Sequence, residues 1–149
     1  MILETKNKKI NLVYRTRSIV KVTNLLQGKN FEEVYFDALS QNNIDALSKI
    51  ISVFAEDPDS GVSAFKNSEL VYDFIDDYMA ENEKSYQDIF KEIAEDINKE
   101  GFFMKRRTTE ELQEKISSPL SFNMDEIIKN STEKAVQAIA TEQFQGFLG

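Results

Sequence analysis

The sequence predicts a mainly α-helical domain with a small β-hairpin at its N-terminus. In residues 10–15, the apolar side chains of Ile10, Leu12 and Tyr14 alternate with Asn11, Val13 and Arg15, a period of two that suits a strand of a half-buried sheet. After residue 16, apolar residues recur instead at intervals of three and four, which is the period of a helix packed on one side. Asparagine, serine and threonine stand in N-cap positions before several of these segments.

The hairpin is expected over residues 1–15. Ile10, Leu12 and Tyr14 mark its second strand, and the polar stretch 5–9 provides the turn. An isolated hairpin is only marginally stable in water, so it must pack on the helices that follow.

Three helices are predicted next, each opened by a residue suited to the N-cap position. The proposed caps are Thr16, Asn30 and Asn43, and Asn30 forms a capping-box pattern with Glu33. Gly28 is placed to stop the first helix. The resulting helices cover residues 16–27, 31–41 and 44–56.

A loop, DPDSG at 57–61, separates these helices from the later ones. The cap and stop residues of the second half are Ser85, Gly101 and the pair of Thr108 with Glu111. A serine-proline break at 117–119 precedes a long final helix. The helices of this half are predicted over 68–82, 86–100, 109–116 and 124–145.

The predicted organisation is a helical domain over residues 1–119 and a C-terminal amphipathic helix within 120–149. That helix either packs on the same domain or serves assembly through its apolar side, which comprises Ile127, Ile128, Val136, Ile139, Phe144 and Phe147. The expected core comprises Leu12, Tyr14, Ile19, Leu26, Phe31, Leu39, Leu47, Ile51, Phe54, Phe74, Ile75, Phe90 and Ile93.

The inventory of side chains argues against an enzyme. The 149 residues contain no cysteine and no histidine, which removes thiolate chemistry, histidine-dependent nucleophiles and the commonest general base near neutral pH. The five glycines are scattered and form no phosphate-binding loop. We therefore expect no catalytic residues, no metal site and no cofactor.

Hydropathy and charge predict a cytosolic protein. No run approaches the roughly 18 apolar residues of a membrane span, and the first residues lack the order of a signal peptide. Residues 1–29 carry seven basic side chains and one acidic, whereas residues 30–104 carry five basic and eighteen acidic ones. The basic segment 1–29 and the acidic segment 30–104 should attract each other, within one molecule or between neighbouring copies.

Two acidic stretches are candidates for a metal site. Asp73, Asp76, Asp77 and Glu81 fall near one helical face and offer oxygen ligands for calcium or magnesium. That face lies opposite the apolar stripe, and we interpret it as a solvated surface. The loop that begins at Asp57 resembles an EF-hand loop, but its glycine is fifth rather than sixth and its twelfth residue is serine, so we reject that interpretation.

Two basic clusters were weighed as nucleic-acid sites. Lys105, Arg106 and Arg107 stand beside Phe102 and Phe103, a combination that can contact phosphates and stack on bases. The surrounding acidic chain would repel a polyanion, so we expect the two phenylalanines in the core. The second cluster consists of Lys6, Lys8 and Lys9. It suits an exposed hairpin turn, where lysines discourage aggregation between strands.

The first part of the chain carries a family resemblance. A basic-tipped hairpin followed by YRTRSIVKVTNLLQGKNFEEVYFDALSQNNIDALSKII resembles the tail assembly chaperones of long-tailed bacteriophages, in particular those of phages that infect Gram-positive hosts. NKK at 7–9 stands where the family has a polar turn, and the step from Ala38 through Asn43 to Leu47 matches its succession of helices. The resemblance covers roughly residues 1–56. The turn lacks the family's common glycine, and the C-terminal half shows no resemblance.

The resemblance implies a non-enzymatic role. Such proteins bind the long, helical tape measure protein in the host cytoplasm, keep it soluble during tail assembly and are not retained in the mature virion. Many also exist as a longer product of ribosomal frameshifting, whose extension recruits the tail tube protein. We accordingly expect the tape measure protein and further copies of this chain as partners, with no nucleic acid and no membrane.

Two other functions stay open. A small acidic helical regulator, encoded by a phage or mobile element, would bind a host protein through the acidic stretch 69–100, as a mimic of nucleic acid does. An enzyme that acts through carboxylates is the third interpretation.

Overall fold

The computed structural model describes residues 1–117, and the chain divides into two units after Leu112. The first unit, Met1–Leu112, is mainly helical with a small antiparallel sheet at its N-terminus, as predicted. The elements are β1 (Ile2–Glu4), β2 (Lys9–Leu12), α1 (Thr16–Leu25), α2 (Phe31–Ser40), α3 (Ile44–Phe54), β3 (Ala55–Glu56), α4 (Ser68–Asn82), α5 (Tyr86–Glu100) and α6 (Thr109–Ser117). The predicted helix over 124–145 lies outside the described residues.

The predicted hairpin is present as β1 and β2, which pair with Leu3 opposite Ile10. Its turn is closed by Thr5, whose backbone N–H donates to the carbonyl of Lys8 over 2.8 Å. The Thr5 hydroxyl accepts from the N–H groups of Asn7 and Lys8, over 3.2 and 3.1 Å. No residue of this turn has a positive φ angle, so the turn does not require a glycine.

A third strand, β3, joins the hairpin to the end of α3. It pairs antiparallel with β2 and places Leu12 opposite Ala55, while the N–H of Val13 donates to the carbonyl of Phe54 over 2.9 Å. The predicted helix over 44–56 therefore ends two residues early, because the residues after Phe54 continue as a strand. A strand of two residues has no periodicity that a sequence pattern could indicate.

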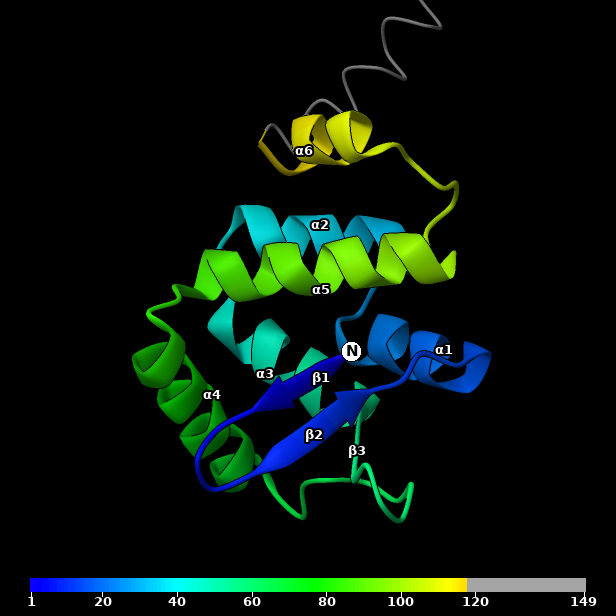
Figure 1. Ribbon diagram of the computed structural model, residues 1–149. Helices are drawn as coiled ribbons and strands as arrows, with labels where there is room; N and C mark the ends of the chain where they lie inside the picture. Colours follow the sequence, from blue (N-terminus) through cyan, green and yellow to red (C-terminus); the bar gives the residue numbers. More distant parts are fainter. Residues whose placement is uncertain (118–149) are drawn as a thin grey trace, which may run out of the picture. The chain divides into compact units, whose positions relative to one another are not determined.

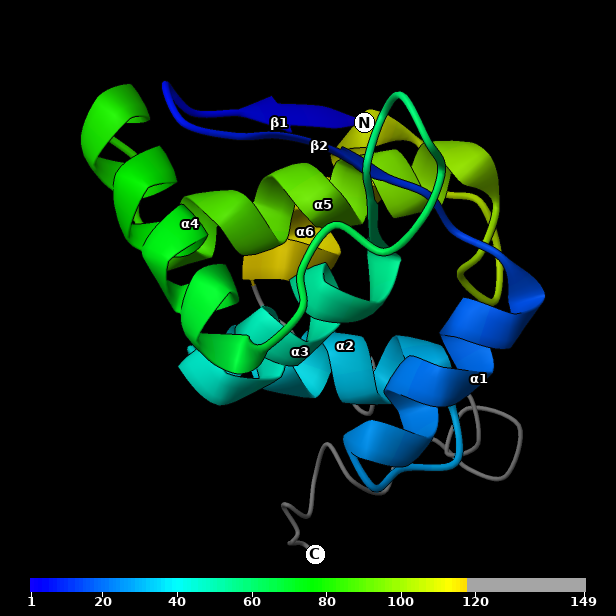
Figure 2. The ribbon, with the colours of Figure 1, turned by 90° about the horizontal axis from the view of Figure 1, so that it is seen from below.

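Helix α3 is the central element of the first unit. It contacts α1, α2, α4, α5 and β2, and Figures 1 and 2 show it with α1 and α4 on its two sides and the strands across it. A helix surrounded in this way is apolar on more than one face. Its inaccessible apolar side chains are Ala46, Leu47, Ile50, Ile51 and Phe54.

Most of the predicted caps are confirmed. Asn30, Asn43 and Ser85 each accept a hydrogen bond from the backbone N–H three residues further along the chain. Thr108 and Glu111 form a reciprocal pair, in which each side chain accepts from the other residue's N–H. These contacts explain why the starts of α2, α3, α5 and α6 are predictable.

The prediction for α1 is wrong in two respects. Arg15, not Thr16, occupies the N-cap position, and its side chain makes no capping hydrogen bond. Ile19 and Leu26 are half-buried rather than part of the core, although they share a helix face with Val22, which is fully buried. The other eleven predicted core residues are buried.

The link from α1 to α2 passes too close to α2 for any side chain at position 28. A Cβ atom at Gly28 would lie 2.0 Å from Cγ1 of Val34, well inside the contact distance of two carbon atoms. The predicted role of Gly28 as the helix stop is wrong, because α1 ends at Leu25 and Gln27 takes the left-handed conformation with a φ angle of 61°. Glycine at position 28 serves the close approach of the backbone instead.

A buried ion pair holds the segment 102–107 against α2. The guanidinium of Arg107 donates to both carboxylate oxygens of Glu32, over 3.0 and 2.9 Å, and the two side chains are 8% and 1% exposed. The N–H of Met104 donates to the same carboxylate over 2.9 Å. Asn98 on α5 bonds both the N–H and the carbonyl of Arg107, each over 3.0 Å. The buried charges are thus paired and also hydrogen-bonded, as burial of charge requires.

The same segment inserts an aromatic ring into the core. Phe103 is buried, and its ring centroid lies 5.9 Å from that of Phe31, 5.7 Å from Tyr35 and 5.1 Å from Phe36. The expectation that Phe103 is a core residue is confirmed. Phe102 is only half-buried, with its ring 6.2 Å from that of Tyr14.

Truncation of central side chains should destabilise the protein strongly. Leu47→Ala and Phe90→Ala should each lower the free energy of unfolding by about 2–5 kcal/mol, because both side chains are fully inaccessible. Val62→Ala is the control, since Val62 is 62% exposed and its loss should change that free energy by less than about 0.5 kcal/mol. Urea denaturation followed by circular dichroism measures all three. Equal effects at the three positions would contradict this core.

Removal of one partner of the buried ion pair should cost more than removal of a surface pair. Glu32→Ala or Arg107→Ala should lower the free energy of unfolding by about 3–5 kcal/mol, because each leaves a buried charge without its partner. The double variant should cost much less than the sum. The control is Lys49→Ala, which removes an exposed pair with Asp45 and should cost at most about 1 kcal/mol. Additive effects of the two buried substitutions, measured by urea denaturation, would show that the pair is not coupled.

Candidate functional site

The acidic face of α4 lies against the turn of the hairpin. An open pocket of about 430 Å³ is lined by Thr5, Asn7 and Lys8 from the turn and by Asp73, Asp76 and Asp77 from α4. The backbone N–H of Lys6 donates to Oε1 of Glu81 over 2.9 Å. The basic turn and the acidic helix therefore meet within one chain. The hydrogen bond uses a backbone amide, and within residues 1–117 no ion pair joins the turn lysines to α4.

The carboxylates of α4 are solvated in this arrangement. Asp73, Asp76 and Glu81 are exposed and Asp77 is half-buried. In the part of the chain that the structure describes, no three histidine, cysteine, aspartate or glutamate side chains converge as the ligands of one metal ion would. The residues weighed as a metal site thus lie on one helix surface without forming a ligand cage.

The carboxylate of Asp57 closes its own loop. Oδ1 accepts from the N–H groups of Asp59 and Ser60, over 2.9 and 3.0 Å. The hydrogen bond from the Ser60 backbone, followed by that from Asp59, lowers the pKa of Asp57. Gly61 completes the loop with a φ angle of +74°. The loop is a turn held by its first residue, in agreement with rejection of the EF-hand interpretation.

The basic cluster at 105–107 is divided by the fold. Arg107 is committed to the buried pair with Glu32, whereas Lys105 and Arg106 are exposed. Phe103 lies in the core and cannot stack on a base. The five residues weighed as a nucleic-acid site therefore do not form one accessible surface.

A half-buried tyrosine, Tyr78, joins α4 to α5. The hydroxyl of Tyr78 donates to Oε1 of Glu92 over 3.1 Å, and Lys84 forms an ion pair with the same carboxylate. Burial, with the charge and hydrogen bond of Glu92, raises the pKa of Tyr78 to about 12. Such a phenol stays protonated near neutral pH and is poorly suited to acid–base catalysis. The arrangement connects two helices.

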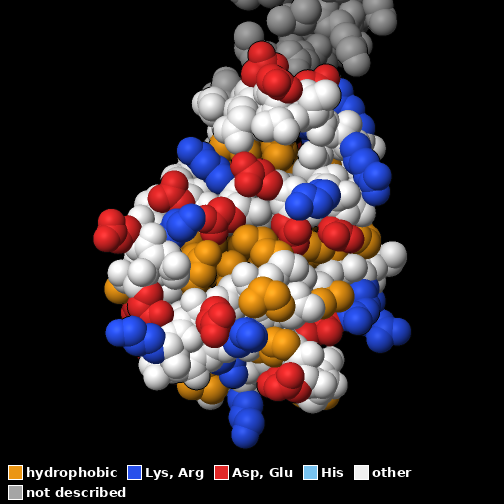
Figure 3. Space-filling model, viewed as in Figure 1, with side chains coloured by type: hydrophobic (Ala, Val, Ile, Leu, Met, Phe, Trp, Pro, Cys, Tyr) orange, Lys and Arg blue, Asp and Glu red, His pale blue; other side chains and the backbone are white. Residues whose placement is uncertain are grey.

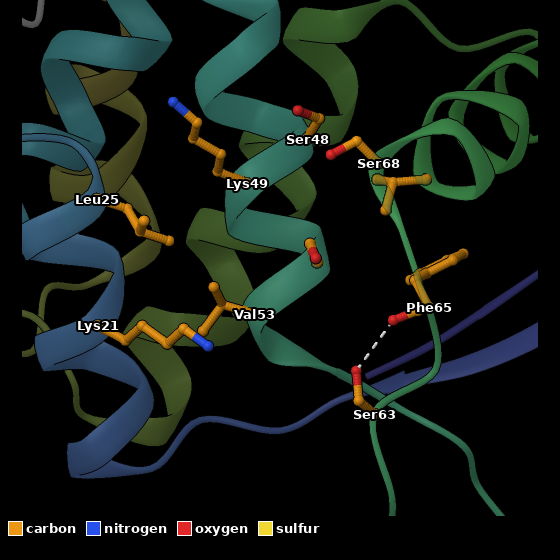
Figure 4. Close-up of a pocket in the computed structure, with 10 residues that line it drawn as sticks. Lys21, Leu25, Ser48, Lys49, Val53, Ser63, Phe65 and Ser68 are labelled. Atoms are coloured by element: carbon orange, nitrogen blue, oxygen red, sulfur yellow. Dashed lines mark hydrogen bonds between the residues drawn. The ribbon is translucent and has the colours of Figure 1, made fainter.

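An open groove runs along α3, with α1 on one side and the segment 63–71 on the other (Figure 4). Its volume is about 400 Å³. The polar part of its lining consists of two lysines, Lys21 and Lys49, and of four serines. The apolar part consists of Leu25, Val53, Phe65 and Val71. We call this feature the α3 groove.

α1 leaves two of its apolar residues exposed beside the α3 groove. Successive helical residues are about 100° apart, so Val20 points nearly opposite to Val22, whereas Leu25 lies beside the buried face that carries Val22. Val20 is 52% exposed and Leu25 is 41% exposed. Val20 and Leu25 fall within the predicted helix over residues 16–27, and no local pattern indicates that these two side chains stay exposed. Lys21 and Lys49 were not singled out at all.

Figure 3 shows a second apolar surface, a band of hydrophobic side chains across the face that carries β1, β2 and α5. Ile2 on β1 is 52% exposed. Lysine, arginine, aspartate and glutamate side chains all surround this band. Because charges of both signs border it, the band shows no charge preference for a partner, in contrast to the α3 groove.

Comparisons with models of protein families, with curated proteins and with solved structures find no match. Within residues 1–117, no helix has the length and apolar character needed to cross a membrane. A functional proposal therefore rests on the surfaces of the chain itself and on the resemblance of its first 56 residues.

Divalent cations should leave the stability unchanged. Melting curves followed by circular dichroism with calcium, with magnesium and with a chelator should coincide, because Asp73, Asp76 and Asp77 are not arranged as ligands. The matched control replaces the three aspartates with asparagine and should behave identically. A melting temperature that rises by several degrees with calcium in the unchanged protein, but not in the triple variant, would establish a metal site on α4.

Proposed function

We propose that this protein is a non-enzymatic tail assembly chaperone, which binds the tape measure protein of a long-tailed phage and keeps it soluble in the host cytoplasm. The observation that carries the proposal is the α3 groove, an open surface on a helical body that is lined by both apolar and polar residues. A helix of the client would lay its apolar side along Leu25 and Val53, as amphipathic helices do in grooves of other proteins.

The position of the groove in the sequence supports the proposal. The resemblance to tail assembly chaperones covers roughly residues 1–56, and this part includes α1 and α3, the two helices that line most of the groove. The hairpin turn lacks the family's common glycine and is closed instead by the hydroxyl of Thr5.

The chemistry of the described residues supports a role without catalysis. Tyr14, Tyr35 and Tyr78 have raised pKa values, in each case mainly through burial, and all three stay protonated near neutral pH. Histidine and cysteine are absent from the chain. A groove lined by lysines and serines without either residue is better suited to binding than to group transfer.

The wider role follows from the same family resemblance. The chaperone would act in several copies along its client, and a longer frameshifted form would recruit the tail tube protein to the assembly. The chaperone would dissociate before the virion is complete. The apolar residues expected on the final helix within 120–149 are the proposed attachment between copies, and they lie outside the described residues.

A second candidate is an acidic regulator that binds a host protein. The observation that favours it is the solvated face of α4, on which Asp73, Asp76 and Glu81 are exposed. A protein that mimics nucleic acid presents carboxylates in such a row. Under this alternative, the protein would have no effect on the solubility of a tape measure protein.

Co-expression with the tape measure protein of the same genome tests the proposal. The tape measure protein should move from the insoluble to the soluble fraction and should co-purify with this chain, because its apolar helix surface is covered. The control is an unrelated acidic helical protein of similar size. A tape measure protein that aggregates equally in both cases would overturn the chaperone function.

A further inference from the structure

We propose that the α3 groove selects an acidic amphipathic helix, one whose apolar stripe is flanked by aspartate or glutamate side chains. The inference deepens the proposed function and rests on it for the identity of the client, because the tape measure protein would supply that helix. The selection itself depends only on residues of this chain.

The first argument is the charge of the groove. The protein carries a net charge of −8, yet the ionisable residues that line the α3 groove are Lys21 and Lys49, without a carboxylate. A groove of one charge sign on a surface of the other sign attracts ligands that the rest of the molecule repels. A helix with lysines beside its apolar stripe would bring like charges together here.

The second argument is that the two lysines are not equivalent. Lys49 forms an ion pair with Asp45, one turn earlier on α3, over 2.8 Å. Within residues 1–117, no such ion pair engages Lys21, which is exposed. Arg17 is also exposed and stands one turn before Lys21 on α1, but it lies outside the lining of the groove. A carboxylate on the ligand would complete the pairing that the chain leaves open.

The third argument is the placement of the apolar contact beside Lys21. Leu25 follows Lys21 by one turn of α1 and is 41% exposed, and Figure 4 shows both side chains reaching toward α3. Val53 lies on α3 opposite them and is half-buried. An apolar side chain of the ligand would rest between Leu25 and Val53 while its acidic neighbour contacts Lys21. This combination fits an amphipathic helix better than a small anion.

The groove also has a direction. A neighbouring pocket of about 310 Å³ shares Leu25 and Lys49 with it and continues toward α2, where Asp37 and Asp45 join the lining. Charge thus changes from positive at the Lys21 end to mixed at the α2 end. The bound helix would place its acidic residues over Lys21 and its neutral or basic residues toward α2.

Two synthetic helices of about 18 residues, or five turns, test the selection. Both carry leucine at intervals of three and four, with glutamate flanking the stripe in one and lysine in the other. Fluorescence anisotropy of labelled peptide with the full-length protein should show binding of the glutamate peptide at least about tenfold tighter than that of the lysine peptide. Equal affinities, or a preference for lysine, would overturn the inference.

Matched variants locate the binding. Lys21→Glu and Leu25→Ser should each lower the affinity for the glutamate peptide at least about tenfold. The first substitution removes the charge contact and the second removes the apolar contact. The controls are Lys29→Glu, an exposed lysine outside the groove, and Val62→Ser, an exposed apolar residue outside it. Circular dichroism should show all four variants folded. Equal losses of affinity in the control variants would mean that the peptide binds through net charge or nonspecific hydrophobic association and not through the groove.

Co-expression of the same variants separates this inference from the proposed function. If Lys21→Glu and Leu25→Ser still keep the tape measure protein soluble, the groove is not the client site and the inference fails while the chaperone function stands. If the glutamate peptide binds as expected but the unchanged protein does not solubilise the tape measure protein, the chaperone function fails and the selectivity of the groove stands. If Leu25→Ser instead dissociates self-associated protein in sedimentation and no peptide competes, a second copy occupies the groove and the inference is overturned.

Discussion

The contact between Glu32 and Arg107 connects parts of the fold that are far apart in sequence. Glu32 lies in the first turn of α2, and Arg107 follows the end of α5. Moving both charges out of water costs several kcal/mol each, and the bidentate geometry with an additional bond from the N–H of Met104 to the carboxylate offsets that cost, while Asn98 holds the backbone of Arg107 in place. The pair determines where the segment 102–107 crosses α2. It thereby places Phe103 among the rings of α2, and the capping residue of α6 follows one position later at Thr108.

The elements that were predictable from sequence are those with local causes. α3 and α5 carry regular apolar stripes and begin at Asn43 and Ser85, whose hydrogen bonds involve residues only three positions away. β3 was missed because its cause is pairing with β2, about 45 residues earlier in the chain. Glu32 looks like an ordinary acidic residue at a helix start, and Arg107 looks like part of an exposed basic run. Their partnership spans 75 positions, and no local pattern indicates it.

The candidate site was less predictable than the fold because it depends on how α1 lies beside α3. The sequence indicated that α1 is apolar but not which of its faces would be covered. α1 contributes Val22 and Thr23 as its buried residues, whereas α2 and α3 each contribute six. One wall of the α3 groove is therefore anchored by few buried side chains, and local opening costs least in such elements. A wall of this kind can adjust to client helices whose apolar residues differ in size.

The pairing of β2 with β3 has a consequence for synthesis of the protein. The sheet needs Ala55 and Glu56, and the ion pair between Arg15 and Glu56 reinforces the same junction. A chain emerging from the ribosome can form the hairpin alone only transiently, since a two-stranded hairpin is marginal in water. The sheet becomes complete only when residues up to 56 have left the exit tunnel, by which time α1, α2 and α3 are also available. The strands of the hairpin are thus stabilised by a segment that is made much later, and the α3 groove forms later still, because its second side is the segment 63–71.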